Sequence, residues 1–267
     1  MGLLGWEARM AENAKVVVPI EQAAEKPYSL VLAYPSPDED SVRTRIRQLE
    51  DLRVTSLVFE GSLRIDHLSV LGKGVSGMVI AGIVDGRRVA LKIRRVDSRR
   101  RDMHRESEML RLANTAGVGP AYLGNTLDVL AMELVEGQRL PVWLAGLKGR
   151  GRKSRVKLAV RTMLEQCQKL DAKQLDHGEL SRAHKNILVA ADDSPSIVDF
   201  ESASLSRRPS NFTSLTQYLF LAGVMARKVG RILGPVGREE LLACLRAYKA
   251  GQPDAFGSTL KVCNVLT

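Results

Sequence analysis

Several features common in other proteins are scarce or missing in this sequence. Aromatic residues make up only 4% of its 267 residues, and no cluster of them is visible that would stack on the bases of single-stranded nucleic acid. The three cysteines, Cys167, Cys244 and Cys263, are widely spaced and form no Cys-x-x-Cys pair, which argues against zinc and redox sites. No run approaches the roughly 18 uncharged apolar residues of a membrane-spanning helix. We therefore expect structural thiols and no membrane association.

Targeting and repeat signals are missing as well. Residues 1–15 lack the basic flank and the apolar run of a secretory signal, so we expect a cytoplasmic protein. The chain contains no internal repeat and no low-complexity segment. With 45% hydrophobic and 26% charged residues, it is long enough to bury a sizeable core in one or two domains.

Acidic residues are scarce in the larger part of the chain. Residues 1–60 carry seven Lys/Arg and ten Asp/Glu, whereas the remaining residues carry 33 basic and 20 acidic side chains. The basic residues concentrate at 87–101 and 148–157. This excess favours a polyanionic partner such as ATP, an acidic protein or RNA, and a merely solvated basic face is the alternative.

The order of expected elements changes twice along the chain. Residues 1–60 read as a disordered lead followed by a small α/β unit, with a strand at 28–34, a helix at 39–52 capped after Pro-Ser-Pro-Asp, and a strand from 57. From Leu68 the pattern predicts short strands with a single helix at 101–113. After Pro141 it becomes mainly helical. The expected helices there are 156–170, 215–233 and 239–248, and the expected strands are 187–189 and 196–198.

A glycine-rich loop, Leu71-Gly-Lys-Gly-Val-Ser-Gly-Met-Val79, lies between two expected strands. Gly72, Gly74 and Gly77 would let the backbone approach phosphate oxygens, and Ser76 at the tip would add a hydroxyl. A dinucleotide site needs a helix directly after such a loop. Here a strand follows, then Asp85-Gly86 as a hairpin turn and then Val-Ala-Leu-Lys92. The context therefore favours a phosphate-covering hairpin.

Lys92 stands in the middle of an apolar strand, where a charge is costly unless it meets an anion. Glu106 on the next helix can supply a carboxylate that holds the ammonium against the α- and β-phosphates. Glu108 is the competing choice, and the spacing to Leu110 favours Glu106.

A second group of polar residues follows in the helical half. Glu179 precedes a loop, His184 or Asn186 stands at its end, and Asp199 comes ten residues after Val189. Two carboxylates and an amide or imidazole in this order can position a hydroxyl and hold magnesium.

In this order, the parts resemble the eukaryotic-like protein kinase superfamily over residues 68–205. More narrowly, the chain resembles the predicted archaeal Ser/Thr kinases related to the RIO kinases and to the small KEOPS-complex kinase. His177-Gly178, Ser181 in place of a lysine, and the lack of an Ala-Pro-Glu signature point there. The resemblance implies an α+β, two-lobed protein-kinase-like fold. Its β-rich N-lobe would span 61–137, its helical C-lobe 138–267, and residues 1–60 would form the α/β extension.

The resemblance also implies roles for the residues. Lys92 would anchor the phosphates of ATP, Glu106 would pair with Lys92, Asp199 would chelate Mg²⁺, and Glu179 would take the place of the catalytic aspartate. Met132 would guard the adenine pocket, and the backbones of Glu133 and Val135 would bond the base. The phosphate-binding loop and the apolar walls of the pocket would comprise Leu71, Gly72, Gly74, Ser76, Gly77, Val79, Ala90 and Leu188.

The sequence departs from the family pattern at several of these positions. Glu179 is one methylene longer than the usual aspartate, so its oxygens would reach about 1.5 Å further. The family offset for the metal-binding asparagine falls on His184. We favour Asn186, because it begins the expected strand and because magnesium prefers oxygen to imidazole. His177 is expected to brace the loop by hydrogen bonds, and Glu201, in place of glycine, is expected to fix the loop geometry.

We therefore expect an atypical protein Ser/Thr kinase that acts on a protein, which could be the kinase itself, without a conventional activation loop. One alternative is a small-molecule phosphotransferase. The other is a catalytically weak nucleotide-binding protein that associates with RNA or a ribonucleoprotein through its basic surface.

Overall fold

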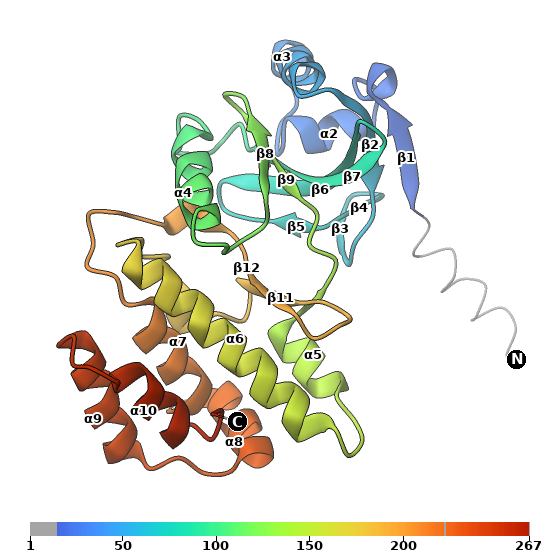
Figure 1. Ribbon diagram of the computed structural model, residues 1–267. Coiled ribbons are helices and arrows are strands. Elements are labelled where there is room, and N and C mark those ends of the chain that lie inside the picture. Colours follow the sequence, from blue (N-terminus) through green and yellow to red (C-terminus); the bar gives the residue numbers. More distant parts are fainter. Residues whose placement is uncertain (1–14, 222, 267) are drawn as a thin grey trace, which may run out of the picture. The chain divides into compact units, whose positions relative to one another are not determined.

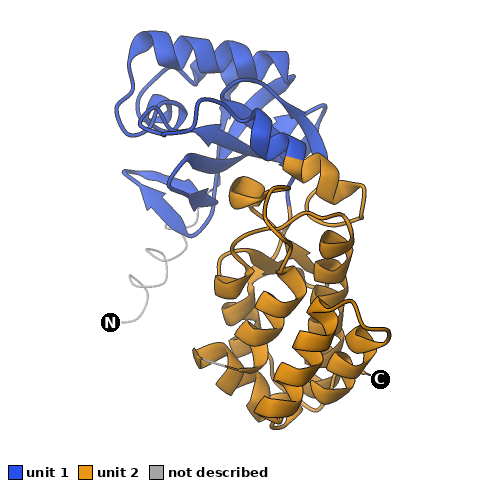
Figure 2. Cartoon of the chain, turned by 90° about the vertical axis from the view of Figure 1, so that its left-hand side faces the viewer, with its two compact units in different colours: residues 1–108, 121–134 blue, residues 109–120, 135–267 orange. Residues whose placement is uncertain are grey.

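The computed structural model describes residues 15–221 and 223–266. The fold is of the mixed α+β class, with a sheet-rich part and several helices (Figure 1). The chain divides into two compact units. Unit 1 comprises residues 1–108 and 121–134, and unit 2 comprises residues 109–120 and 135–267 (Figure 2).

Unit 1 is built on a seven-stranded antiparallel sheet. Its strand order is β1-β2-β6-β7-β9-β8, and β5 pairs with β6 beside this path. The strands are β1 (Val16–Pro19), β2 (Val54–Phe59), β5 (Gly72–Lys73), β6 (Gly77–Val84), β7 (Arg87–Arg94), β8 (Tyr122–Asn125) and β9 (Val129–Glu133). A separate hairpin joins β3 (Leu63–Ile65) to β4 (Leu68–Val70).

The central hairpin of this sheet turns where the sequence predicts it. Val84 pairs with Arg87, and the two residues between them, Asp85 and Gly86, have φ angles of 48° and 74°. Two successive positive φ angles match the twist of the flanking strands, which is why Asp-Gly is favoured there. The register that follows places Lys92 of β7 opposite Val79 of β6 and Leu130 of β9.

The expected strand at 28–34 is wrong, because Tyr28–Leu32 forms the short helix α2. A short apolar run looks the same in a strand and in a buried helix, and this one shows no alternation: Ser29, Val31, Leu32 and Ala33 are all buried. The expected helix at 39–52 is confirmed as α3 (Glu39–Asp51). Its N-cap Asp38 accepts a hydrogen bond of 2.8 Å from the Ser41 amide.

The segment set apart by sequence as an extension shares the core of unit 1. Its described part, residues 15–60, includes the 3-10 turn η1 (Ile20–Gln22), and its strand β2 pairs with β6 inside the sheet. Val18, Leu49 and Leu57 are buried in one hydrophobic cluster with Leu91 of β7.

Unit 2 is mainly helical, and helix α4 (His104–Asn114) crosses from one unit to the other. Its helices are α5 (Leu140–Gly146), α6 (Arg152–Ala172), α7 (Asn211–Phe220), α8 (Gly223–Leu233), α9 (Arg238–Lys249) and α10 (Ala255–Val262). A small sheet has the strand order β10 (Gln138–Arg139), β11 (Ile187–Val189) and β12 (Pro195–Ile197). The 3-10 turn η2 (Leu180–Arg182) precedes β11, and the 3-10 turn η3 (Phe200–Ser202) follows β12.

Two of the three helices expected in this half are confirmed as α6 and α9, the third is corrected, and α5 and α10 were not expected. The single helix expected at 215–233 is two helices, because α7 ends at Phe220 and α8 begins at Gly223, whose φ of 86° lies outside the right-handed helical region. Cys167 and Cys263 are buried free thiols. Among the described residues, no helix combines the length and the apolar character needed to cross a bilayer.

Candidate functional site

A buried ion pair joins strand β7 to helix α4 within unit 1. Lys92 Nζ donates a hydrogen bond of 2.7 Å to Glu106 Oε1, and both residues are only 4% exposed. The competing residue, Glu108, is exposed. Asp102, two residues before α4, accepts a bond of 3.0 Å from the amide of His104, the first residue of the helix that carries Glu106. Unit 1 therefore holds one ammonium in a defined place.

The glycine-rich hairpin lies directly against the stem of Lys92. A Cβ atom added at Gly77 would lie 3.2 Å from Lys92 Cγ and 3.3 Å from Lys92 Cε. Any side chain at position 77 would therefore push against the lysine stem. Gly72 and Gly74 have no such close contact and no positive φ, so a tight approach is required only at Gly77 among these three glycines.

The hairpin tip differs in one detail from the sequence expectation. Gly74 N donates a bond of 2.8 Å to Gly77 O, which closes a tight turn. Val75 is 88% exposed at this turn, whereas Ser76, expected to present its hydroxyl at the tip, is buried. Val75, and not Ser76, is therefore the residue of this turn that is open to solvent.

Four of the residues expected near the nucleotide share one face of the sheet. Val79 pairs with Lys92, and Ala90 pairs with Met132, so the side chains of these four residues point to the same side. The Glu133 side chain accepts a bond of 3.0 Å from the Ala121 amide.

The remaining residues expected to line the adenine pocket are divided between the two units. Leu71 of unit 1 donates its amide proton to Val79 O. Val135 and Leu188 belong to unit 2, where Leu188 pairs with Arg139 and Ser196 in the small sheet.

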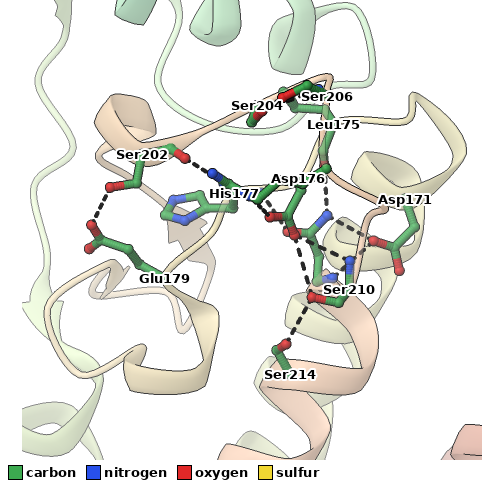
Figure 3. Close-up of polar contacts among 12 residues, drawn as sticks. Asp171, Leu175, Asp176, His177, Glu179, Ser202, Ser204, Ser206, Ser210 and Ser214 are labelled. Atoms are coloured by element: carbon green, nitrogen blue, oxygen red, sulfur yellow. Dashed lines mark hydrogen bonds and ion pairs between the residues drawn. The ribbon is translucent and has the colours of Figure 1, made fainter.

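In unit 2, the Glu179 carboxylate is held at both oxygens. Ser202 Oγ donates to Glu179 Oε1 at 2.5 Å, as Figure 3 shows, and Asn186 Nδ2 donates to Glu179 Oε2 at 3.1 Å. Asn186 is only 2% exposed, whereas His184 is exposed. Of the two residues that the sequence left open, Asn186 is thus the one beside Glu179.

Asp199 lies just after strand β12 in an unusual backbone conformation. Its φ of 70° and ψ of 76° fall in the left-handed region, which costs a non-glycine residue about 1–3 kcal/mol. The next residue, Phe200, is buried, and its ring lies 5.1 Å from that of His177. The buried ring fixes the chain directly after Asp199. Glu201 lies within the 3-10 turn η3 that begins at Phe200.

His177 braces this region, as the sequence predicts. Its ring nitrogen Nε2 lies 3.1 Å from Val198 O, and its backbone amide donates to Asn211 Oδ1 at 2.8 Å. A carbonyl oxygen can only accept, so Nε2 carries the proton. Complete burial lowers the pKa of His177, which keeps the ring neutral.

Gly178 permits a close approach that the sequence did not reveal. It has a φ of 86°, and a Cβ there would lie 2.5 Å from Arg207 Nη2 and 2.9 Å from Ser202 O. Arg207 fills this space: its Nη2 donates to Ser202 O at 2.6 Å, and its Nε donates to Asp176 Oδ2 at 2.8 Å. Asp176 is buried and also accepts a bond of 3.2 Å from the Ser210 amide.

Sequence reasoning missed Ser202, Arg207 and Asp176 as parts of this network. Their contacts join residues that are 5 to 31 positions apart, and no repeated spacing in the sequence predicts them. Gly178 was no more than a weak signal, because a glycine tolerates a positive φ and a close approach but does not show which neighbour it will meet.

Among the described residues, those expected at the site therefore form one polar group in each compact unit. Unit 1 brings Lys92 and Glu106 together beside Gly77, and unit 2 brings Glu179, Asn186 and Ser202 together. Comparison of the sequence with known protein families and with curated proteins finds no match to either.

Proposed function

We propose that this protein is an ATP-dependent protein kinase that transfers the γ-phosphate of Mg-ATP to a serine or threonine hydroxyl. The observation that carries the proposal is the buried Lys92–Glu106 ion pair beside Gly77. Burying two charges costs several kcal/mol per ion, and apolar residues of similar size would often be as stable. A buried ammonium next to a glycine-rich hairpin is suited to binding phosphate oxygens, and this use would account for the free energy that its burial costs.

In this proposal, unit 1 is the β-rich lobe and unit 2 the helical lobe of a kinase-like fold. The proposal requires both units to close around one nucleotide. Lys92 would bind the α- and β-phosphates. Val79, Ala90 and Met132, which share a sheet face with Lys92, would lie against the adenine.

The second unit would supply the magnesium ligands. Asp199 offers a carboxylate and Asn186 an amide oxygen, which are the ligand types that Mg²⁺ prefers. The Asn186 nitrogen is already bonded to Glu179, so its amide orientation is consistent with an oxygen that faces a metal. Magnesium would neutralise the charge that develops on the transferred phosphoryl group.

Glu179 would orient the acceptor hydroxyl and accept its proton. A carboxylate misplaced by about 1 Å can cost on the order of 100-fold in rate, which matters because glutamate is longer than aspartate. The bonds from Ser202 and Asn186 support this role, because they fix the longer side chain in one orientation.

The test is phosphate transfer from labelled ATP to the protein itself and to a general acceptor protein, with Mg²⁺ present. Wild-type protein should incorporate label, and Lys92→Met and Asp199→Asn should reduce it at least 100-fold. Two matched controls should keep activity: Arg87→Met, exposed at the start of the same strand as Lys92, and Glu239→Gln, exposed in α9. Equal labelling of all four variants and the wild type would remove the proposal.

A second candidate function is binding of a polyanion such as RNA, and it is favoured by a cavity of about 250 Å³ in unit 2. Arg152, Lys228 and Arg231 line this cavity together with Leu144 and Ala145. The sequence contains no Asp or Glu at residues 137–164 or 203–238, so both stretches around these cations are free of acidic residues.

Structured RNA should bind with an affinity that falls steeply with salt, and a double variant, Arg152→Gln with Lys228→Gln, should weaken binding and flatten the salt dependence. An affinity that is insensitive to salt, or unchanged in the double variant, would exclude this function for the cavity.

A further inference from the structure

Arg95, just after strand β7, donates two hydrogen bonds to backbone oxygens of the glycine-rich hairpin. Its amide donates to Ser76 O at 2.8 Å, and its Nη1 donates to Gly74 O at 3.1 Å. The side chain of Arg95 is itself fixed by Asp97, which accepts from Nε at 2.8 Å and from Nη2 at 2.6 Å. The tip of the hairpin is therefore tied to the end of a central strand.

Tyr34 contacts both Arg95 and the hairpin. Arg95 lies over its ring, with 5.1 Å from the guanidinium carbon to the ring centroid. Lys73, which belongs to the hairpin, places Nζ 4.3 Å from the same centroid and 2.6 Å from the Tyr34 hydroxyl oxygen. One aromatic ring thus contacts two cations, Lys73 in the hairpin and Arg95 just after β7.

Tyr34 can serve as an anchor because its own position is fixed. Its backbone oxygen accepts a bond of 3.0 Å from the Val96 amide. It directly follows Ala33 and helix α2, and Val31, Leu32 and Ala33 are completely buried in the core of unit 1. A displacement of Tyr34 would therefore disturb a packed segment, whereas the hairpin alone has an exposed tip at Val75.

We propose that Tyr34 is a positioning residue that braces the glycine-rich hairpin in the conformation that binds phosphate. Tyr34 belongs to residues 28–34, which lie outside the sequence motifs that suggest nucleotide binding. In this proposal, that segment helps to position the phosphate-binding hairpin. The link to phosphate binding rests on the kinase function proposed above, whereas the brace itself does not.

The first measurement is hydrogen–deuterium exchange of the amides at 72–78 without nucleotide. Tyr34→Ala removes the ring and the hydroxyl, and it should speed exchange there about 10-fold, because two cation–π contacts and one hydrogen bond are lost. Tyr34→Phe keeps the ring and should restore most of the protection. Tyr28→Phe is the matched control, since Tyr28 stacks on Phe59, with ring centroids 5.4 Å apart, in the same segment. Unchanged exchange in Tyr34→Ala would overturn the brace.

The second measurement is the affinity for Mg-ADP together with steady-state kinetics for Mg-ATP. Tyr34→Ala should raise the Kd and the KM about 5- to 10-fold and change kcat by less than about 2-fold, because Lys92 and Glu179 are untouched. Recovery in Tyr34→Phe would separate positioning from a general loss of structure. A lower Kd in Tyr34→Ala would overturn the proposal, because Tyr34 would then withhold Lys73 from the ligand.

The two measurements also separate this inference from the proposed function. Faster exchange in Tyr34→Ala, combined with no nucleotide binding by any variant or by the wild type, would establish the brace and remove the kinase function. Nucleotide binding with no difference in exchange would remove the brace and leave the proposed function standing.

Discussion

The Lys92–Glu106 pair makes a strong prediction about stability. At 2.7 Å and an effective dielectric constant of about 20, the two charges attract by about 6 kcal/mol before desolvation is counted. Desolvation offsets most of this, so the pair adds little net stability. Removing one partner is different, because the buried charge that remains loses the opposite charge 2.7 Å away.

Lys92→Met and Glu106→Leu should each reduce the free energy of unfolding of unit 1 by about 3–5 kcal/mol, and the double variant should cost less than either single one. With a slope of about 3 kcal/mol per molar urea, each single variant should lower the unfolding midpoint by roughly 1–1.7 M.

The assay is amide exchange of β7 as a function of urea, with peptides from α6 in unit 2 as the internal control. The reasoning is refuted if either single variant costs less than about 1 kcal/mol, or if the double variant costs the sum of the two. A change in the α6 peptides equal to that in β7 would show that the effect is not specific to the pair.

Three further predictions concern unit 2. Ser202→Ala should lower kcat about 10- to 100-fold with little change in the KM for ATP, because Glu179 loses a positioning hydrogen bond. Ser202→Thr keeps the hydroxyl and should recover activity. Equal kcat in the wild type and both variants would contradict this role. The lowered pKa of His177 means that the unfolded chain binds a proton that the folded one does not. Stability should therefore fall as the pH drops below about 6.5, by up to about 1.4 kcal/mol per pH unit, and urea titrations of His177→Asn should lose this contribution. Gly178→Ala should destabilise the protein by about 1–3 kcal/mol in thermal unfolding because of its positive φ and crowding, whereas Gly146→Ala, with open space around it, should not.

Sequence reasoning succeeded where the signal is local. The Asp85-Gly86 turn follows from the φ angles that two adjacent residues tolerate, and the cap at Asp38 follows from a side chain three residues from its partner amide. The pairing of Lys92 with Glu106 could also be predicted, because a lysine in an apolar strand needs an anionic partner and few carboxylates follow closely after Lys92 in the sequence.

The misses have different physical causes. Residues 28–32 form a helix although their apolar run carries no periodicity, so tertiary packing decided the outcome. The break between α7 and α8 depends on the positive φ of Gly223, and a glycine inside a helical pattern does not reveal which conformation it adopts. The contacts of Ser202 with Glu179 and of Tyr34 with Lys73 join distant segments, and they become visible only once the chain has folded.

The central claim is that Lys92 of unit 1 and Asp199 of unit 2 act on the same nucleotide. The most direct measurement is a crystal structure of the protein with Mn²⁺ and a non-hydrolysable ATP analogue, in which the anomalous signal of manganese locates the metal. The account predicts phosphate oxygens within hydrogen-bond distance of Lys92 Nζ and a metal coordinated by the Asp199 carboxylate and the Asn186 amide oxygen. A nucleotide bound away from Lys92, or a metal with no contact to Asp199, would contradict it.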